Sequence, residues 1–140
     1  MGLCFSSTTG DDDEPAKHSQ FSGGKVVFIA TKDAWNQKLS EAKTQGKIVI
    51  ANFSASWCGP CKSVSPLYIE LSEKHPSLMF LTIDVDELTE LGTQWDVKAT
   101  PTFFFLRDGQ QIDKVVGANT AELQQKITAI VDSRVPGDQK

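Results

Sequence analysis

The sequence has no excess of basic residues, no long apolar run and few cysteines. Its 140 residues include 14 Lys and Arg against 18 Asp and Glu, which gives a formal net charge of −4. Because no basic stripe is present to neutralise nucleic-acid phosphates, we expect no nucleic-acid partner. No stretch approaches the roughly 20 apolar residues of a membrane-spanning helix, and the start MGLCFSSTTG lacks the basic and apolar regions of a secretory signal. These absences predict a cytoplasmic protein.

The three cysteines are too few for the disulfide framework of a small secreted protein. Cys58 and Cys61 form a CxxC pair within WCGPCK, and three interpretations compete for it. A zinc site needs about four ligands, and the other soft candidates are only Cys4, His18 and His75, so we expect no metal. A purely structural disulfide would close too short a loop to stabilise the fold much. The pattern therefore favours a redox-active dithiol that needs no metal or organic cofactor.

Composition divides the chain into one domain and two tails. Residues 1–24 hold the acidic run DDDE and a Ser/Gly-rich stretch with little to bury, which predicts a disordered N-terminal extension. Residues 134–140 are polar and predict a C-terminal tail. Residues 25–133 carry a regular apolar pattern, and their length suits a single domain with one hydrophobic core.

The apolar pattern predicts elements in the order βαβαβαββα. Continuous β-branched and aromatic runs predict strands, and apolar residues at the helical period predict helices. Asp108-Gly109 is a turn signal between the last two strands, which should therefore form an antiparallel hairpin. Alternating strands and helices imply parallel crossovers, so we expect an α/β fold with a central mixed sheet flanked by helices on both faces. The predicted strands are 26–30, 47–53, 78–85, 102–108 and 111–116, and the predicted helices are 31–46, 58–75, 88–95 and 119–131.

Cys58 directly follows a predicted strand and opens the next helix. Unpaired N–H groups and the positive end of the helix dipole would favour the thiolate and lower the thiol pKa from about 8.5 toward ~7 or below. Gly59 removes side-chain bulk beside this accessible sulfur, and Pro60 lies in the first turn, where a missing N–H costs nothing. Cys61 lies one turn further on and is expected to be more buried. We predict thiol–disulfide exchange in which Cys58 attacks and Cys61 resolves the mixed disulfide.

WCGPCK on a strand-to-helix turn, ATPT at 99–102 and the order of elements resemble the thioredoxin family over roughly residues 25–133. FSASWCGPC, DVDE at 84–87 and WDVKATPTFFF resemble its plant h-type branch. The MGLC start and the acidic tail are similar to members with an N-terminal extension. The resemblance implies reduction of disulfides in target proteins, with electrons from thioredoxin reductase or from glutathione and glutaredoxin.

The resemblance also implies a docking surface around the cysteines. In the family, the proline that matches Pro101 is cis and lies against the sulfurs, and the backbone of Thr100-Pro101 pairs with a substrate strand. Trp57 and the stretch Val116-Gly117-Ala118 would complete this surface. Plain core packing is the alternative for Trp57, but its place beside Cys58 at the end of a loop favours the rim.

Two positions depart from the family pattern. Most thioredoxins have a buried Asp where this chain has Asn52, and commonly a Lys where it has Thr82. That Asp is given the role of helping to move the proton of the resolving thiol, and an amide takes no proton near neutral pH. We therefore expect Asn52 to tune the site without acting as a base, while Cys61 loses its proton to water or to the departing substrate thiolate.

The N-terminal extension carries further candidate sites. MGLCFS fits the pattern M-G-x-x-x-[ST], so Gly2 is a candidate for myristoylation. A single myristoyl chain binds membranes only marginally, and DDDE would be repelled by anionic lipids, which leaves palmitoylation of Cys4 as the second anchor for membrane association. Cys4 is alternatively a third redox thiol that attacks the Cys58–Cys61 disulfide, or a cysteine without a role.

Two other functions compete with a reductase. A disulfide isomerase or oxidase uses the same chemistry at a potential near −180 mV instead of about −270 mV, and Pro60 between the cysteines argues against it. A holdase or binding module would use the same groove without turnover.

Overall fold

The computed structural model describes residues 23–133, and the fold within them confirms the predicted α/β class. The elements follow the predicted order βαβαβαββα, with boundaries that differ from those expected by a few residues at most. The predicted tails lie outside the described residues, except that Gly23 and Gly24 are placed. The elements are β1 (Val27–Ile29), α1 (Lys32–Gln45), β2 (Ile48–Ser54), α2 (Gly59–Lys74), β3 (Leu78–Asp84), α3 (Thr89–Gln94), β4 (Thr102–Arg107), β5 (Gln110–Val116) and α4 (Thr120–Ser133).

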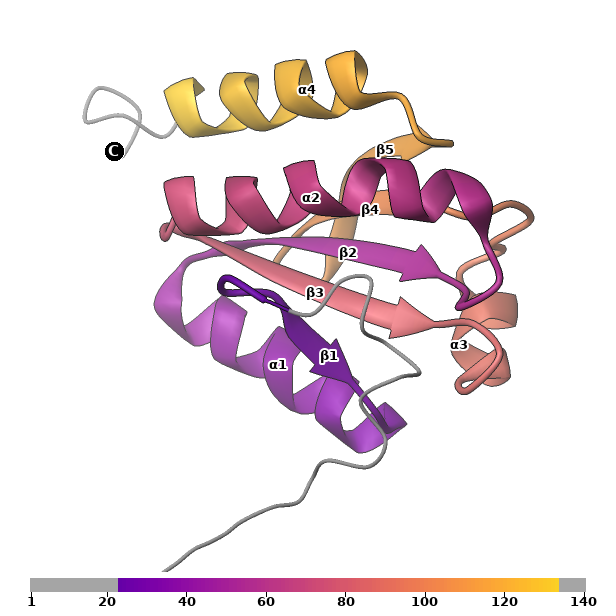
Figure 1. Cartoon of the computed structure of the whole chain (residues 1–140). Helices are drawn as coiled ribbons and strands as arrows, with labels where there is room; N and C mark the ends of the chain where they lie inside the picture. The colour runs from indigo at the N-terminus through magenta and orange to yellow at the C-terminus, as the bar shows by residue number, and fades with distance from the viewer. Residues whose placement is uncertain (1–22, 134–140) are drawn as a thin grey trace, which may run out of the picture.

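The five strands form one mixed sheet in the order β1-β3-β2-β4-β5. β1, β3 and β2 run parallel, whereas β4 is antiparallel to both β2 and β5. Helices α2 and α4 cover one face of the sheet, and α1 and α3 lie on the other (Figure 1). The mixed sheet flanked on both faces is the predicted architecture.

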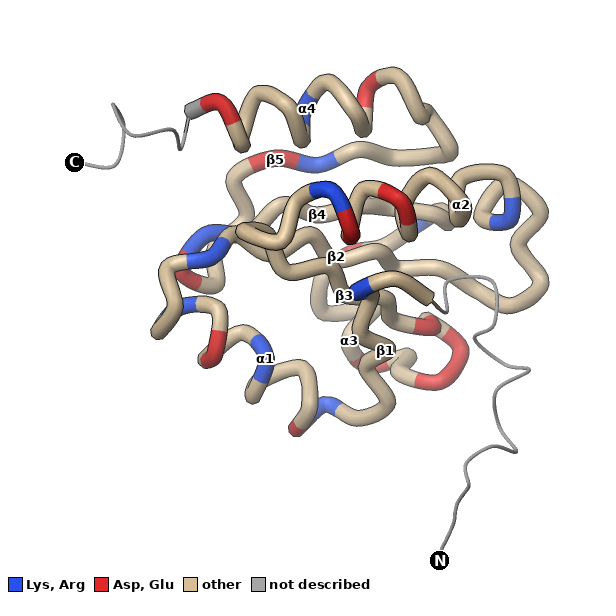
Figure 2. The backbone as a smooth tube through the Cα atoms, turned by 60° about the vertical axis from the view of Figure 1, so that its left-hand side comes forward, with Lys and Arg blue, Asp and Glu red and all other residues tan. Residues whose placement is uncertain are grey.

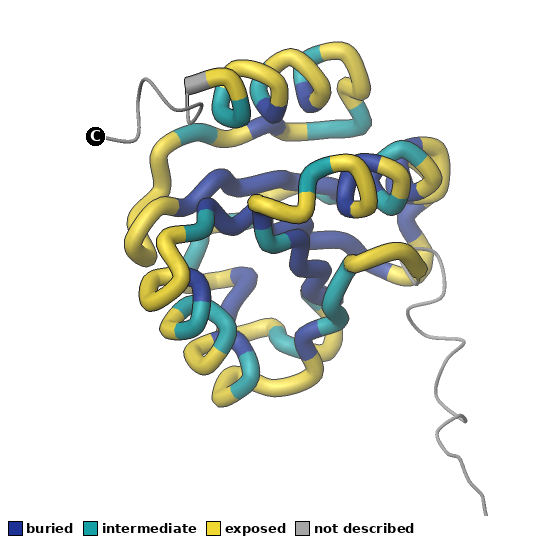
Figure 3. The backbone as a smooth tube through the Cα atoms, turned by 90° about the vertical axis from the view of Figure 1, so that its left-hand side faces the viewer, coloured by how far each residue is buried: buried dark blue, intermediate teal, exposed yellow. Residues whose placement is uncertain are grey.

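Each face of the sheet has its own apolar cluster. The α2/α4 cluster contains Tyr68, Phe80, Phe103 and both Cys58 and Cys61. The α1/α3 cluster packs the rings of Trp35, Phe53, Trp95 and Phe104 in edge-on and tilted contacts. Because both faces are covered, every residue of β2 is buried, as its continuous apolar sequence predicts (Figure 3).

Local sequence signals set the ends of several elements. The Thr31 hydroxyl accepts the N–H of Ala34 at 3.0 Å and caps α1, which ends at Gly46 in the left-handed conformation with φ of 69°. Asp108 and Gly109 have φ of 53° and 80°, the positive values that a type I′ hairpin turn requires. The hairpin turn confirms the expectation drawn from Asp108-Gly109, and Thr31 and Gly46 lie at the ends of the helix predicted over residues 31–46.

Helix α2 continues through an internal proline. Pro66 has no N–H to donate to the carbonyl of Lys62, four residues earlier. The hydroxyl of Ser65 donates to that carbonyl at 3.4 Å and supplies a replacement. The helix therefore runs unbroken from the cysteines to Lys74 and holds them against the sheet.

Candidate active site

The cysteine pair lies where β2 leads into α2. Cys58 is the N-cap residue of α2, with φ of −81° and ψ of 112°, and its Sγ accepts the N–H of Cys61 at 3.1 Å. The N–H of Cys58 donates to the Ala55 carbonyl at 3.1 Å, which closes the turn after the strand. Cys58 and Cys61 are joined by a disulfide, with their Cα atoms 5.3 Å apart. The sulfur of residue 58 thus occupies the helix N-terminus that its sequence position predicts.

In this oxidised form the exposure of Cys58 differs from the expectation. Cys58 is 2% exposed and Cys61 is 0% exposed, so both are buried instead of one being accessible. Cys58 packs in the same apolar cluster as Cys61, and its sulfur is bonded to Cys61 and accepts the helix N–H. Gly59 and Pro60, the first two residues of α2, are exposed beside it.

Trp57 projects at the surface directly before the cysteines. It is 70% exposed, and its Nε1–H donates to Oδ2 of Asp86 at 2.6 Å. Asp86 in turn donates its backbone N–H to Oδ1 of Asp84 at 2.8 Å. Burial raises the pKa of the Asp84 carboxyl above its ordinary value, although the N–H of Asp86 opposes the shift. Asp86 is not among the site residues predicted from the sequence, because no spacing rule links positions 29 residues apart.

The structure brings together the two backbone segments predicted to dock substrates. The Thr100-Pro101 peptide bond is cis, as the resemblance implies. The carbonyl of Pro101 accepts the N–H of Gly117 at 2.8 Å. Val116 is 52% exposed, and Ala118 packs against the cluster that contains both cysteines.

Asn52 and Thr82 form a buried polar pair on neighbouring strands. They are register partners in β2 and β3, and Nδ2 of Asn52 donates to Oγ1 of Thr82 at 3.3 Å. The Oδ1 atom of Asn52 is buried and has no hydrogen-bond partner among the described residues. Because side chains alternate along a strand, Asn52 points to the same face as Ile50, which belongs to the cluster with Cys58 and Cys61.

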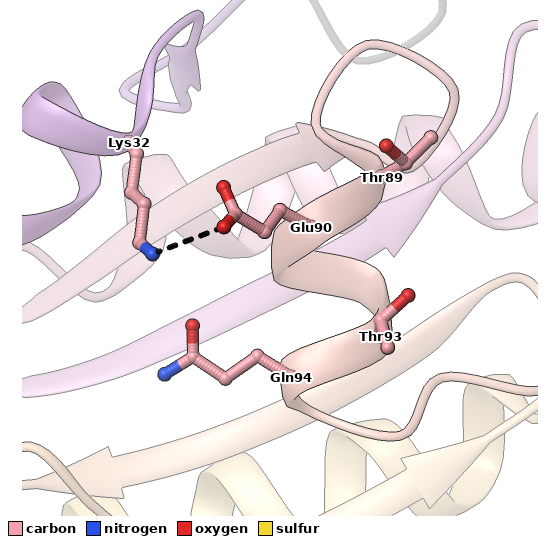
Figure 4. Close-up of a pocket in the computed structure, with 5 residues that line it drawn as sticks. All are labelled: Lys32, Thr89, Glu90, Thr93 and Gln94. Carbon is pink, nitrogen blue, oxygen red and sulfur yellow. Dashed lines mark ion pairs between the residues drawn. The ribbon is translucent and has the colours of Figure 1, made fainter.

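A separate pocket of about 690 Å³ lies between the start of α1 and helix α3 (Figure 4). The residues that line it are polar or charged, and Lys32 and Glu90 point toward each other with Nζ and Oε2 at 3.9 Å. Neither cysteine of the pair lines it. The lining residues are Lys32, Thr89, Glu90, Thr93 and Gln94.

Residues 23–133 contain no group of three or more His, Cys, Asp or Glu side chains placed to hold a metal ion. None of the helices in that range has the length and apolar content needed to cross a membrane. Gly2 and Cys4 lie outside the described residues.

The Cys58–Cys61 disulfide lies at a helix start, on a mixed sheet with helices on both faces. Such a pair can accept two electrons from other thiols to become a dithiol, and can pass them on to another disulfide. The fold and the site thus define a thiol–disulfide oxidoreductase. The family model described as Thioredoxin matches residues 26–129, and the chain belongs to the thioredoxin family.

Its relatives include plant h-type members. The chain is 62% identical over 138 residues to "Thioredoxin H-type" of Populus jackii, covering 99% of both chains. It is 62% identical over 133 residues to "Thioredoxin H9" of Arabidopsis thaliana, covering 95% of this chain and 94% of that relative. A crystal structure of a poplar thioredoxin h mutant has a TM-score of 0.81 at 65% identity, over 84% of this chain and 92% of the other.

Proposed function

We propose that this dithiol–disulfide reductase attacks target proteins through Cys58 and resolves the mixed disulfide through Cys61. The observation that carries the proposal is the N-cap position of Cys58, where Sγ accepts the Cys61 N–H at 3.1 Å. After reduction, the same N–H and the helix dipole would stabilise a thiolate on this sulfur. Gly59 adds no side-chain bulk beside this sulfur.

The exchange conserves atoms and electrons. The Cys58 thiolate attacks one sulfur of a target disulfide, forms a mixed disulfide and expels the other target sulfur as a thiolate. Cys61 loses its proton to water or to that departing thiolate, and then attacks the Cys58 sulfur and releases the second target sulfur. Two electrons pass to the target, and the Cys58–Cys61 disulfide remains. Asn52 acts as a tuning residue, since an amide cannot carry the proton.

The docking surface for the target comprises Trp57, Thr100, Pro101 and the stretch Val116-Gly117-Ala118. Support comes from the hydrogen bond between Pro101 and Gly117, and from the exposed side chains of Trp57 and Val116. Disulfide-containing proteins are the substrates of this surface. Thioredoxin reductase, or glutathione with a glutaredoxin, restores the dithiol.

The test is insulin reduction, run separately with thioredoxin reductase and with glutathione plus glutaredoxin. We expect turnover with at least one donor, and we expect Cys58→Ser and the Cys58→Ser/Cys61→Ser double variant to lose it while keeping the wild-type circular dichroism spectrum. Full biological function in the double variant would instead identify a holdase or binding module. A potential of the wild-type couple near −180 mV, instead of about −270 mV, would identify an isomerase or oxidase.

For the N-terminal extension we propose acylation of Gly2 and Cys4, or a redox role for Cys4, in a protein that works in the cytoplasm or on its membranes. The sequence MGLCFS supports acylation, and a tail of this length can span a small domain, which supports redox use. Mass spectrometry of protein from its native cell separates them. Acyl mass on Gly2 and Cys4 supports the anchor, and a disulfide that contains Cys4 supports the third redox thiol.

A further inference from the structure

The indole of Trp57 is held in place although most of it is exposed. A side chain that is 70% exposed normally samples several rotamers and loses that freedom when a partner binds. Here Nε1–H donates to a carboxylate oxygen of Asp86 at 2.6 Å, a short bond of the charge-assisted kind. The ring beside the reactive cysteine is therefore ordered before any target arrives.

Asp86 is itself fixed to the sheet. Its N–H donates to Oδ1 of Asp84 at 2.8 Å, and Asp84 is the last residue of β3 and only 6% exposed. The Asp84 carbonyl accepts the N–H groups of Glu87 and Leu88 at 3.0 and 2.9 Å, which closes the turn.

The same loop is tied to the strand that leads to the cysteines. Val85 donates its N–H to the carbonyl of Ser54, the last residue of β2, at 2.9 Å. The loop that carries the Asp86 carboxylate is thus hydrogen-bonded to the end of the strand that leads to Cys58.

We propose that Asp86 is a positioning residue that holds the Trp57 indole as a preordered contact for protein targets. The inference rests on the proposed function, in which Trp57 belongs to the docking surface. Asp86 acts through Trp57 and not on the sulfurs. Its effect therefore falls on protein disulfides, which must contact the rim, more than on small disulfides, which need only the sulfur.

The charge of Asp86 is the competing explanation. The end of β3 and the loop after it are acidic at Asp84, Asp86 and Glu87 (Figure 2). The field of these charges alone could alter the rate of encounter with a partner or the reactivity of the thiol. Two variants separate charge from hydrogen bonding. Asp86→Asn removes the charge and keeps an oxygen acceptor, whereas Glu87→Gln removes one charge from the next position in the same loop.

The experiment uses the full-length chain, reduced beforehand and freed of reductant. Second-order rate constants are measured for its oxidation by insulin and by 5,5′-dithiobis(2-nitrobenzoate), and the ratio of the two constants is compared between variants. We expect Asp86→Ala to lower this ratio about two- to tenfold, the cost of ordering one side chain on binding, while Asp86→Asn and Glu87→Gln stay within about twofold of wild type. The indole N–H resonance of Trp57, assigned with Trp57→Phe, should move in Asp86→Ala and stay in place in Glu87→Gln.

An Asp86→Ala ratio equal to wild type overturns the inference, and so does an Asp86→Asn loss as large as that of Asp86→Ala, because charge would then be the cause. Trp57→Ala distinguishes this failure from failure of the proposed function. If Trp57→Ala reduces insulin at the wild-type rate, the docking role of Trp57 is wrong. If Trp57→Ala is slow while Asp86→Ala matches wild type, only the positioning role of Asp86 is wrong.

Discussion

Asn52 is buried on β2 with its amide nitrogen on Thr82, and among the described residues its amide oxygen has no partner. A buried acceptor left unpaired costs free energy, and the hydrogen bond from the amide nitrogen to Thr82 does not remove that cost. It faces the cluster that holds both cysteines. The proposed tuning role of Asn52 therefore rests on its orientation toward this cluster.

Replacing Asn52 by Asp tests that role at the scale of one residue. The carboxyl would be buried against a neutral Thr82, so desolvation should raise its pKa above about 3.9. At pH values between the unfolded and the folded pKa, the folded variant keeps a proton that the unfolded chain has lost. The stability of the variant relative to wild type should therefore fall as pH rises from the unfolded pKa through the folded one. As a base that faces the cluster containing Cys61, it should also add a pH-dependent step to insulin reduction.

The measurements for Asn52→Asp are urea unfolding and kcat/KM at a series of pH values. Asn52→Ser, which keeps a neutral polar group, is the matched control and should follow the wild-type pH profile. A variant whose turnover tracks wild type at every pH from acid to alkaline would show that residue 52 has no influence on proton transfer.

At the scale of elements, α4 docks through an apolar stripe and one ion pair. Leu123 and Ile127 are fully buried in the α2/α4 cluster with Val115 of β5. At the edge, Nζ of Lys126 lies 3.0 Å from Oδ2 of Asp113, with both side chains partly exposed. Burial acts to raise the pKa of Asp113, but hydrogen bonds from Lys126 and from the Lys114 N–H hold it below its ordinary value.

The two contributions to α4 docking should differ in size. Ile127→Ala should lower the free energy of unfolding by about 2–5 kcal/mol, because it leaves a cavity in the core. Lys126→Ala should lower it by about 0–1 kcal/mol, since the pair is solvent-screened. The contribution of the pair is present above the unfolded pKa of Asp113 and is lost as pH falls through the depressed folded pKa. Chemical denaturation of both variants at neutral and acid pH measures the two free energies of unfolding. Equal losses of stability in Ile127→Ala and Lys126→Ala would contradict the expected difference in size.

At the scale of the whole molecule, the start of the domain is packed onto α2. The N–H of Lys25 donates to Oγ of Ser72 at 2.9 Å, next to Gly24 with φ of 55°. A Cβ on Gly24 would lie 2.7 Å from Oγ of Ser72 and 2.9 Å from the carbonyl oxygen of Ile69. Sequence composition assigns Gly23 and Gly24 to the tail, but their contacts belong to the domain.

Gly24→Ala should therefore destabilise the fold more than Gly46→Ala. Both glycines have positive φ, which costs a side chain about 1–2 kcal/mol, but a Cβ on Gly46 meets no atom within 4 Å. The contact at Gly24 should add about 1–3 kcal/mol for overpacking. Denaturant unfolding of the two variants gives the comparison. Equal free energies would show that the segment before β1 moves away from α2 at no cost.

The sequence by itself determined the order of elements, the extent of the first helix, the turn at Asp108-Gly109 and the place of Cys58 at a helix start. These depend on apolar periodicity and on backbone preferences of adjacent residues, which are local. Only the tertiary structure decided the strand order, the burial of Cys58 in the disulfide form, the unpaired oxygen of Asn52 and the bond from Trp57 to Asp86. The strand order and the bond from Trp57 to Asp86 join residues far apart in the chain, and the burial of Cys58 and Asn52 depends on packing of the whole sheet and its helices around them.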